Sequence, residues 1–268
     1  MKEPEYIQIN RQAWNILVPA HLKSDFYEMD AFLKGKNSLK EIEMPLLGDL
    51  KDKKVLHLQC HFGQDSLSLA RMGAEVTGVD FSDQAIKTAE ELNTRLGLDV
   101  RFICCDVYSL PDFLDDSFDL VFSSYGTIGW LPDIKAWAAI VEKYLKPGGR
   151  FVFAEFHLVV WMFDEDFAEV KYRYFNDAVL EETETGSYAD KESEKERKFM
   201  SWNHALADVI SSLLATGLHL EFFEEYDFSP HNCFQHTVEV GESRYRIRHL
   251  DDKIPMTYAL RMVKPANR

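Results

Sequence analysis

Two aspartates stand at the ends of apolar runs, where a buried strand would bring a carboxylate to the edge of a sheet. Asp80 follows residues 76–79 and comes roughly 20 residues after the first loop, the usual interval for an acid that accepts hydrogen bonds from ribose hydroxyls. Asp106 follows residues 102–105 in the same way and would lie near an adenine, whose exocyclic amine can donate to a carboxylate. The alternatives are a helix N-terminal acid at Asp80 and an ordinary loop aspartate at Asp106.

The loop that precedes Asp80 has the layout of a ligand cradle. The apolar run 55–58 leads into Gln59, Cys60, His61 and Gly63, and a helix-like stretch follows. Such a strand–loop–helix unit places a backbone cradle on the same edge of a parallel sheet as the acid of the next strand. The arrangement indicates that the chain holds an adenosine-containing cofactor.

Two other ligand classes fit this loop less well. His57, Cys60 and His61 are metal-binding residue types, but the two histidines flank a turn and no second cluster completes a four-ligand set. A nicotinamide dinucleotide needs the three glycines of G-x-G-x-x-G around its pyrophosphate, whereas this loop has only Gly63. We therefore expect no metal, and a nicotinamide cofactor remains a weaker alternative.

The elements that must position these residues alternate between strand and helix. Apolar runs predict strands at 54–58, 75–80, 100–104, 118–123 and 151–156, followed by 218–226 and 256–263. Ser82 and Gly97 delimit one helix, and 134–145 and 203–216 are further helical stretches. This repetition favours a parallel sheet with helices on both faces.

The chain divides into an N-terminal segment, 1–50, and a main domain, 51–268, that contains an insertion at about 160–200. Residues 1–50 show helical spacing, and Trp14, His21 and Tyr27 there would close one side of the cofactor site. In the insertion we expect short strands at 171–175 and 179–184, a hairpin turn at 185–187 and a solvated charged loop at 190–198. Its many aromatic residues suit either a lid or a dimer surface.

Composition limits the partners. The 268 residues are 46% hydrophobic, which is ample for a large buried core. The formal charge of -15 argues against nucleic acid, because phosphate binding requires a lysine and arginine footprint. Four cysteines without a CxxC pair indicate reduced thiols. With no signal-peptide core and no apolar run long enough to span a bilayer, we expect a cytoplasmic protein without a membrane partner.

Taken in order, five segments resemble the class I S-adenosylmethionine-dependent methyltransferases that act on small molecules. They are 55–63, 76–82 with Asp80 and Phe81, Cys105-Asp106, 118–121, and the turn at 145–149. Each segment is weak evidence by itself, whereas their order and intervals together are specific. The resemblance covers about residues 50–160 well and the two closing strands more loosely.

The resemblance implies a fold and a cofactor. The implied fold is a three-layer, Rossmann-like α/β fold whose seven-stranded, mostly parallel sheet has an antiparallel last strand, here with a β-rich lid insertion. The implied cofactor is S-adenosylmethionine, with Asp80 on the ribose, Asp106 and Val107 beside the adenine, and Ser123, Ser124 and Tyr125 lining the site. The other expected cofactor-binding residues are His57, Gln59, Cys60, His61, Gly63, Phe81 and Cys105.

The first loop departs from the family pattern, which has an acid followed by three alternating glycines. Here His57 replaces the acid, Gln59 and His61 replace the first two glycines, and only Gly63 remains. Because glycine permits positive φ, either the loop geometry suits ordinary residues or the pocket is reshaped. The amide of Gln59 can still bind the amine or carboxylate of the methionine part.

Three residues are candidates for the chemistry. His157 ends the fifth strand beside Glu155 and is a candidate general base, with a structural histidine as the alternative. His204 opens the helix after the insertion and would reach the cleft from the lid. Tyr125 follows the fourth strand and, with Trp130, would form an aromatic wall, unless both simply pack in the core.

We therefore expect transfer of a methyl group from S-adenosylmethionine to an unidentified small-molecule acceptor, mainly by holding the two in near-attack geometry. The alternative is a non-catalytic S-adenosylmethionine-binding or regulatory protein of the same fold, which the altered loop favours. An NAD(P)-dependent oxidoreductase is less favoured. A homodimer is possible.

Overall fold

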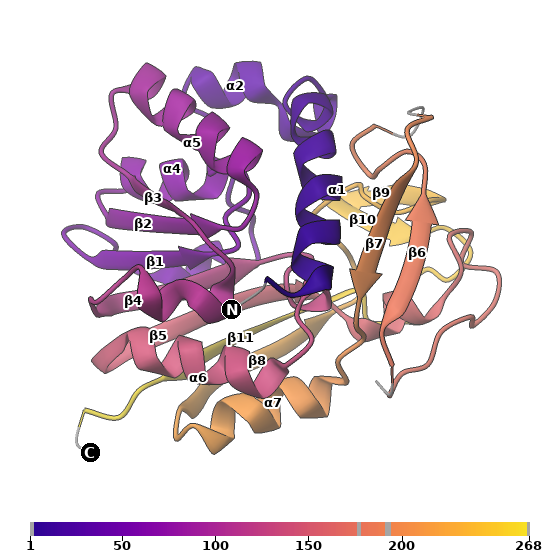
Figure 1. Cartoon of the computed structure of the whole chain (residues 1–268). Coiled ribbons are helices and arrows are strands. Elements are labelled where there is room, and N and C mark those ends of the chain that lie inside the picture. The colour runs from indigo at the N-terminus through magenta and orange to yellow at the C-terminus, as the bar shows by residue number, and fades with distance from the viewer. Residues whose placement is uncertain (1–2, 176–177, 191–193, 267–268) are drawn as a thin grey trace.

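A seven-stranded sheet lies at the centre of the protein, whose computed structural model describes residues 3–175, 178–190 and 194–266. The strands are β1 (Lys54–Leu58), β2 (Glu75–Asp80), β3 (Arg101–Cys104), β4 (Phe118–Ser124), β5 (Leu145–Phe156), β8 (His219–Tyr226) and β11 (Thr257–Val263). Their order is β3-β2-β1-β4-β5-β11-β8 (Figure 1). Strands β1 to β5 pair in parallel, and β11 runs antiparallel to both β5 and β8. The predicted mostly parallel sheet with an antiparallel last strand is confirmed.

Helices cover both faces of the sheet. Helices α4 (Gln64–Arg71) and α5 (Asp83–Leu96) pack on one face together with α2 (Met29–Leu33) and α3 (Met44–Leu47), whereas α6 (Ile134–Tyr144) and α7 (Leu206–Ala215) cover the other. Along β5 the side chains alternate, so that Phe151 and Phe153 join the α6–α7 core and Val152 and Ala154 the opposite one. The three-layer arrangement is confirmed.

Side-chain caps and glycines set the helix ends as the sequence predicts. The hydroxyl of Ser82 accepts a hydrogen bond from the backbone N–H of Ala85 and caps α5, which ends at Gly97 with φ 62°. Asp133 caps α6 by accepting from the N–H groups of Lys135 and Ala136. Among the described helices, none combines the length and the apolar character that crossing a membrane requires.

The N-terminal helix α1 (Glu5–His21) stands between the sheet and a hairpin of β6 (Leu180–Glu184) and β7 (Arg197–Ser201) (Figure 1). The buried side chain of Asn10 joins α1 to β7, donating to the carbonyl of Met200 at 2.8 Å and accepting from its N–H at 2.9 Å. Phe199 packs against Ala13 and Leu17 of α1. The helix and the hairpin therefore form one wall over the carboxyl edge of the sheet.

The insertion contains a hairpin, but not the one expected. Residues 171–175, all of them described, form bends, so the predicted strand there is wrong, and β6 pairs with β7 instead. The charged loop predicted at 190–198 overlaps the start of β7. On that strand Arg197 and Phe199 are buried and Lys198 between them is exposed. Residues 191–193 of the predicted loop lie outside the described part. A second hairpin, β9 (Thr237–Gly241) and β10 (Arg244–Ile247), was not predicted.

Candidate functional site

The loop after β1 keeps a glycine-like backbone although most of its residues have side chains. Gln59 has φ 55°, His61 has φ 52° and Gly63 has φ 77°. A residue with a Cβ atom in this left-handed region costs about 1 kcal/mol relative to glycine. The sequence left open whether the loop geometry suits ordinary residues or the pocket is reshaped. In the structure, Gln59 and His61 adopt the positive φ angles themselves.

Gly63 is the position in this loop that a side chain could not occupy. A Cβ atom there would lie 2.7 Å from the ring of Phe102 and 2.9 Å from Cβ of Ala89. The residue lets α4 begin close to β3 and α5, and it directs the helix N-terminus toward the carboxyl edge of the sheet.

Asp80 ends β2 beside this loop, and its carboxylate holds the loop in place. Oδ2 accepts the N–H of His61 at 2.8 Å, and Oδ1 accepts the N–H of Ser82 at 2.9 Å. Burial raises the pKa of Asp80 to about 6, against the lowering effect of these N–H donors. Each oxygen keeps a lone pair for a further donor, so the carboxylate can both shape the loop and bind a ligand.

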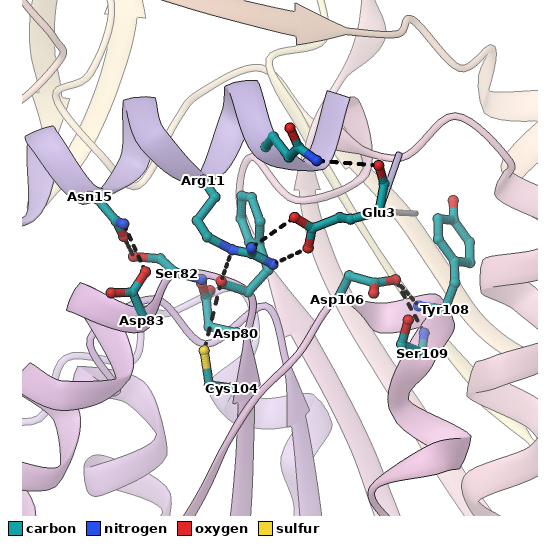
Figure 2. A network of polar contacts seen from close by, with 12 residues as sticks. Glu3, Arg11, Asn15, Asp80, Ser82, Asp83, Cys104, Asp106, Tyr108 and Ser109 are labelled. Atoms are coloured by element: carbon teal, nitrogen blue, oxygen red, sulfur yellow. Dashed lines mark hydrogen bonds and ion pairs between the residues drawn. The ribbon is translucent and has the colours of Figure 1, made fainter. Parts of the chain in front are cut away.

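Asp106 lies beyond the end of β3 and does not close the strand as predicted, and its carboxylate has a local partner. Oδ1 accepts the N–H groups of Tyr108 and Ser109 and caps the 3-10 helix η2 (Val107–Asp112). Figure 2 shows Arg11 of α1 and Glu3, which precedes this helix, reaching toward this edge. Within the described chain, the lining of the main cavity does not include Cys105, Asp106 or Val107. The adenine role of Asp106 and Val107 and the cofactor contact of Cys105 stay predictions.

Helix α1 is fastened along the same edge by polar contacts. Nε of Arg11 donates to the carbonyl of Phe81 at 2.9 Å, and its other nitrogens pair with the carboxylate of Glu3. Further along the helix, Asn15 accepts from the Ser82 hydroxyl at 2.6 Å and donates to Asp83 at 2.8 Å (Figure 2). Helix α1 is therefore fixed to the segment between β2 and α5.

The loop after β4 is held by a buried acid. Glu155 on β5 accepts the N–H groups of Gly126, Thr127 and Ile128, and its carboxylate also accepts the Thr127 hydroxyl. The carbonyl of Thr127 accepts from Nε2 of Gln59 at 2.7 Å. This bond joins the first loop to the loop after β4 and fixes which end of the Gln59 amide is free.

The three candidate catalytic residues have different surroundings. Tyr125 lines the cavity with φ 45°, and its hydroxyl donates to Glu43. His204 also lines the cavity, and its Nε2 donates to the carbonyl of Leu131 at 2.7 Å. His157 accepts the N–H of Val159 through Nδ1 and pairs with Glu225 through Nε2 at 2.9 Å. Its role as a base stays a prediction, although both ring nitrogens are engaged.

A cavity of about 870 Å³ opens at this edge, bounded by α1, the first loop, the loop after β4 and the β6 hairpin. It brings together nine of the predicted site residues: His57, Gln59, Cys60, His61, Asp80, Phe81, Ser124, Tyr125 and His204. Six others lie outside its lining within the described chain: Gly63, Cys105, Asp106, Val107, Ser123 and His157. The cavity lining thus brings predicted cofactor-binding residues of the first loop together with residues after β4.

Four buried polar atoms on residues of the cavity lining have no hydrogen-bond partner within the described residues. They are Nε1 of Trp14, Oε1 of Gln59, Nε2 of His61 and the hydroxyl oxygen of Tyr258. Buried polar groups are normally paired, and leaving one unpaired costs about 1–3 kcal/mol. Trp14 can only donate, the Gln59 oxygen can only accept, and His61 can do either. The cavity is therefore suited to a ligand that carries both donors and acceptors.

Some residues of the site were not foreseen from the sequence. Glu43, 1% exposed, holds Tyr125, and burial raises its pKa to about 7 although the Tyr125 hydrogen bond lowers it. His231 lies against Tyr125 and Phe26 from the loop after β8. Neither lies in a recognisable motif, and their side chains meet the site only through the tertiary fold.

Comparison with known proteins links this chain to methyltransferases. Residues 55–149 match the family described as "Methyltransferase domain". A ubiquinone biosynthesis O-methyltransferase of Idiomarina loihiensis is 31% identical over 137 residues, which is 50% of this chain and 56% of that protein. A demethylmenaquinone methyltransferase of Clavibacter sepedonicus is 37% identical over 106 residues, 39% of this chain and 41% of that protein. The matches thus span about half or less of these relatives.

Solved structures share the whole architecture at low sequence identity. A geranyl diphosphate C-methyltransferase from Streptomyces coelicolor A3(2), in complex with S-adenosyl-L-homocysteine, superposes with a TM-score of 0.64 and 13% identity, covering 98% of this chain and 99% of that chain. An S-adenosylmethionine-dependent methyltransferase from Clostridium acetobutylicum gives a TM-score of 0.57 and 16% identity, covering 95% and 97%. At these identities the likeness establishes the fold.

Proposed function

We propose that this chain, whose residues 55–149 match a methyltransferase domain, transfers a methyl group from S-adenosylmethionine to a small-molecule acceptor. The observation that carries the proposal is the position of Asp80, which ends β2 at the cavity and faces a first loop in glycine-like conformation. Fold alone does not choose an acceptor, so the proposal rests on this site.

The residues at the cavity fit the cofactor. The carboxylate of Asp80 would bind the ribose hydroxyls, for which each oxygen has a free lone pair. The free oxygen of Gln59 would accept from the ammonium group of the methionine part, and the N–H of Trp14 would donate to its carboxylate. The unpartnered polar atoms of Gln59 and Trp14 thus support a zwitterionic ligand.

Bound there, the cofactor supplies a methyl group that is already activated as part of a sulfonium ion. The work of the chain is then to orient the acceptor and to exclude water. Tyr125 and Trp130, after β4, line the cavity and supply aromatic surface, which favours a cationic centre. The buried carboxylate of Glu155 fixes the loop that carries them.

A small acceptor is consistent with the volume of the cavity, since pockets for small ligands span roughly 300–1,000 Å³. The relatives named above include an O-methyltransferase of ubiquinone biosynthesis and a demethylmenaquinone methyltransferase, and these names support acceptors with a ring. The possible homodimer and the cytoplasmic location stay predictions from the sequence.

The proposal is tested by measuring S-adenosylhomocysteine binding by calorimetry, with NAD and NADP as the competing cofactor class. We expect S-adenosylhomocysteine to bind and the dinucleotides not to bind. Formation of S-adenosylhomocysteine is then followed by mass spectrometry in the presence of S-adenosylmethionine and a panel of phenols, amines and thiols. Absence of binding would contradict the cofactor assignment.

A second function, a non-catalytic S-adenosylmethionine-binding protein, is favoured by one observation. Helix α1 is bonded through Arg11 and Asn15 to residues 81–83, between β2 and α5, which suits a protein that holds its ligand. Turnover of any acceptor in the panel would exclude this function, whereas tight binding without turnover throughout the panel would favour it.

A further inference from the structure

A chain of polar rings runs from the first loop into the wall of the cavity. Nδ1 of His61 lies 3.4 Å from the hydroxyl of Tyr27, which lies 2.5 Å from the hydroxyl of Tyr188. That hydroxyl lies 3.5 Å from Nδ1 of His21, and Nε2 of His21 lies 3.2 Å from the hydroxyl of Ser187. These four rings, His61, Tyr27, Tyr188 and His21, are called the ring chain below.

The ring chain is assembled from parts of the protein that are far apart in sequence. His21 ends α1, Tyr27 ends the 3-10 helix η1 (Asp25–Tyr27), His61 lies in the loop after β1, and Tyr188 follows β6. The indole of Trp14 packs edge-on against both histidine rings. The geometry therefore depends on the docking of α1 and the hairpin against the sheet.

One end of the ring chain is open to a ligand. Nε2 of His61 is buried at the cavity and, within the described residues, has no hydrogen-bond partner. The residue holds φ 52°, a conformation that glycine would adopt without steric cost. A strained residue with an unsatisfied polar atom in a cavity is a candidate for a functional role.

The hydrogen-bond pattern allows protons to move in one direction. With the proton of His61 on Nδ1, this atom donates to the Tyr27 oxygen, Tyr27 donates to Tyr188, and Tyr188 donates to Nδ1 of His21. Nε2 of His21 then carries a proton and donates to Ser187. In this arrangement Nε2 of His61, a residue of the cavity lining, has a lone pair with no donor among the described residues.

A second part of the cavity lining is aromatic. Phe26 packs against Tyr188 and stacks on His231, and His231 in turn contacts Tyr125. The lining then continues through Phe156, Trp161 and Phe234. An acceptor that fills this space would present a flat apolar ring to these side chains.

We propose that His61 accepts the proton of an aromatic hydroxyl group, so that the methyl acceptor is a phenol and the protein an O-methyltransferase. The inference rests on the function proposed above and names its acceptor class. Tyr27, Tyr188 and His21 are positioning residues that carry the proton away from His61, and His61 is the catalytic residue because it touches the acceptor.

The step balances in atoms and charge. The hydroxyl proton passes to Nε2 of His61, the oxygen electron pair forms the new bond to the methyl carbon, and the carbon–sulfur bond breaks with its electrons on sulfur. The proton on Nδ1 of His61 passes along Tyr27 and Tyr188 to His21. The cavity thus holds one positive charge before the step, on the sulfonium, and one after it, on an imidazolium.

Burial and neighbouring cations keep both histidine rings neutral before the step. Burial lowers the pKa of His61 well below its usual value, and the neighbouring His21 lowers it further. Burial, then Arg197, lowers the pKa of His21 to about 4. Asp65 near Tyr27, Cys233 near both tyrosines and Asp80 behind the His61 backbone are the other ionisable groups nearby. Both histidines are therefore neutral before the step, and the imidazolium forms as the sulfonium charge disappears.

The test uses 4-nitrophenol as a chromogenic probe with the S-adenosylhomocysteine complex, which lacks the sulfonium charge. If His61 takes the hydroxyl proton, the bound probe shows the phenolate absorption band in buffer acidic enough that the free probe is mostly neutral. We expect at least a tenfold higher ratio of phenolate to phenol on the protein than in solution. A bound probe that stays neutral, or no binding of the probe to the complex, would overturn the inference.

Variants identify the group that takes the proton. His61→Asn keeps a residue type that tolerates positive φ and should abolish the phenolate band while the probe still binds. Tyr27→Phe should reduce the band at least threefold, whereas His219→Asn, on the exposed surface of β8, should leave it unchanged. An undiminished band in His61→Asn, or loss of the band in His204→Asn instead, would contradict the assignment.

A measurement on the unmodified protein covers the case in which His61→Asn does not fold. Nitrogen-15 NMR of the imidazoles should show His61 with a proton on Nδ1 and none on Nε2, and a proton on Nε2 would overturn the inference. If S-adenosylhomocysteine itself fails to bind, the proposed function fails. If it binds and the probe does not ionise, only the choice of acceptor and base fails.

Discussion

The hydroxyl of Tyr125 donates a 2.6 Å hydrogen bond to Oε2 of Glu43, which joins the loop after β4 to the residue that precedes α3. The other carboxylate oxygen of Glu43 accepts the N–H of Lys40 at 2.5 Å. Both carboxylate oxygens of Glu43 thus accept hydrogen bonds, and one of these bonds holds Tyr125, which has a left-handed backbone conformation, at the cavity. The position of the loop after β4, at the cavity, therefore depends on an acid in the N-terminal segment.

Replacing Glu43 by Gln should change how stability depends on pH. Burial raises the pKa of Glu43 from 4.5 to about 7, so between these values the folded protein binds a proton that the unfolded chain releases. Stability therefore falls as pH rises across this window, by about 3 kcal/mol from this group. A Gln side chain does not titrate, so the variant does not lose this stability as pH rises. The melting temperature of the variant minus that of the natural protein should therefore increase from pH 4.5 to pH 7.

The surface residue Glu41 provides a control for this measurement. It pairs with Arg244 in an exposed ion pair, and Glu41→Gln should give a pH profile parallel to that of the natural protein. A parallel profile for Glu43→Gln as well would mean that Glu43 is ionised in the folded protein throughout the range.

Replacing Asp80 by Asn should weaken S-adenosylhomocysteine binding at least tenfold, about 1.4 kcal/mol. The amide nitrogen of Asn cannot accept a hydrogen bond, so the His61 N–H or the Ser82 N–H loses its partner and the ribose loses an acceptor. Calorimetric titration measures the change. Asp83→Asn, at the exposed start of α5, should bind within twofold of the natural protein, and equal affinities for both variants would exclude Asp80 as the ribose ligand.

Gly63→Ala should destabilise the protein by about 3 kcal/mol, because the new methyl group meets Phe102 and Ala89 and the residue has positive φ. Gly97→Ala is the matched comparison: its φ is 62°, and nothing lies within 4 Å of the added Cβ. It should cost only about 1 kcal/mol. Urea unfolding measures both, and similar losses would show that backbone conformation alone, without crowding, requires glycine at position 63.

Asn10→Ala should loosen the wall formed by α1 and the hairpin. The substitution removes both hydrogen bonds to the backbone of Met200 and leaves buried backbone groups unpaired, at a cost of about 2–4 kcal/mol. Amide hydrogen exchange in β6 and β7 should become faster, while exchange in β1 and β4 is unchanged. Ile16→Ala, at an exposed position of α1, should leave the hairpin protected, and unchanged exchange in Asn10→Ala would mean that apolar packing holds the wall.

The sheet could be predicted from the sequence because its strands are apolar runs with clear breaks. The predicted bounds of β1 and β2 match the structure, and the antiparallel β11 follows from the family resemblance. Asp80 could be placed at the cavity because a strand end fixes where its side chain lies. These features depend on local pattern, which a single sequence contains.

The hairpins and the ring chain could not be predicted because they depend on contacts between distant segments. Strand β7 begins in a run of mixed charge, and only its pairing with β6 and its packing on α1 make it a strand. Trp14, His21 and Tyr27 were expected near the cofactor, but their meeting with His61 and Tyr188 requires the docked helix. The local sequence around Glu43 gives no sign of its partner Tyr125.

The bonds between Asn10 and Met200 span 190 residues of chain, which has a consequence for biosynthesis. The ribosome releases the first helix long before the strand that receives it, so the nascent chain must wait for its partner. During this interval the apolar side of α1 has no hairpin to cover it, and newly made fragments should be prone to capture by chaperones. The wall formed by α1 and the hairpin would then be among the last parts of the molecule to form.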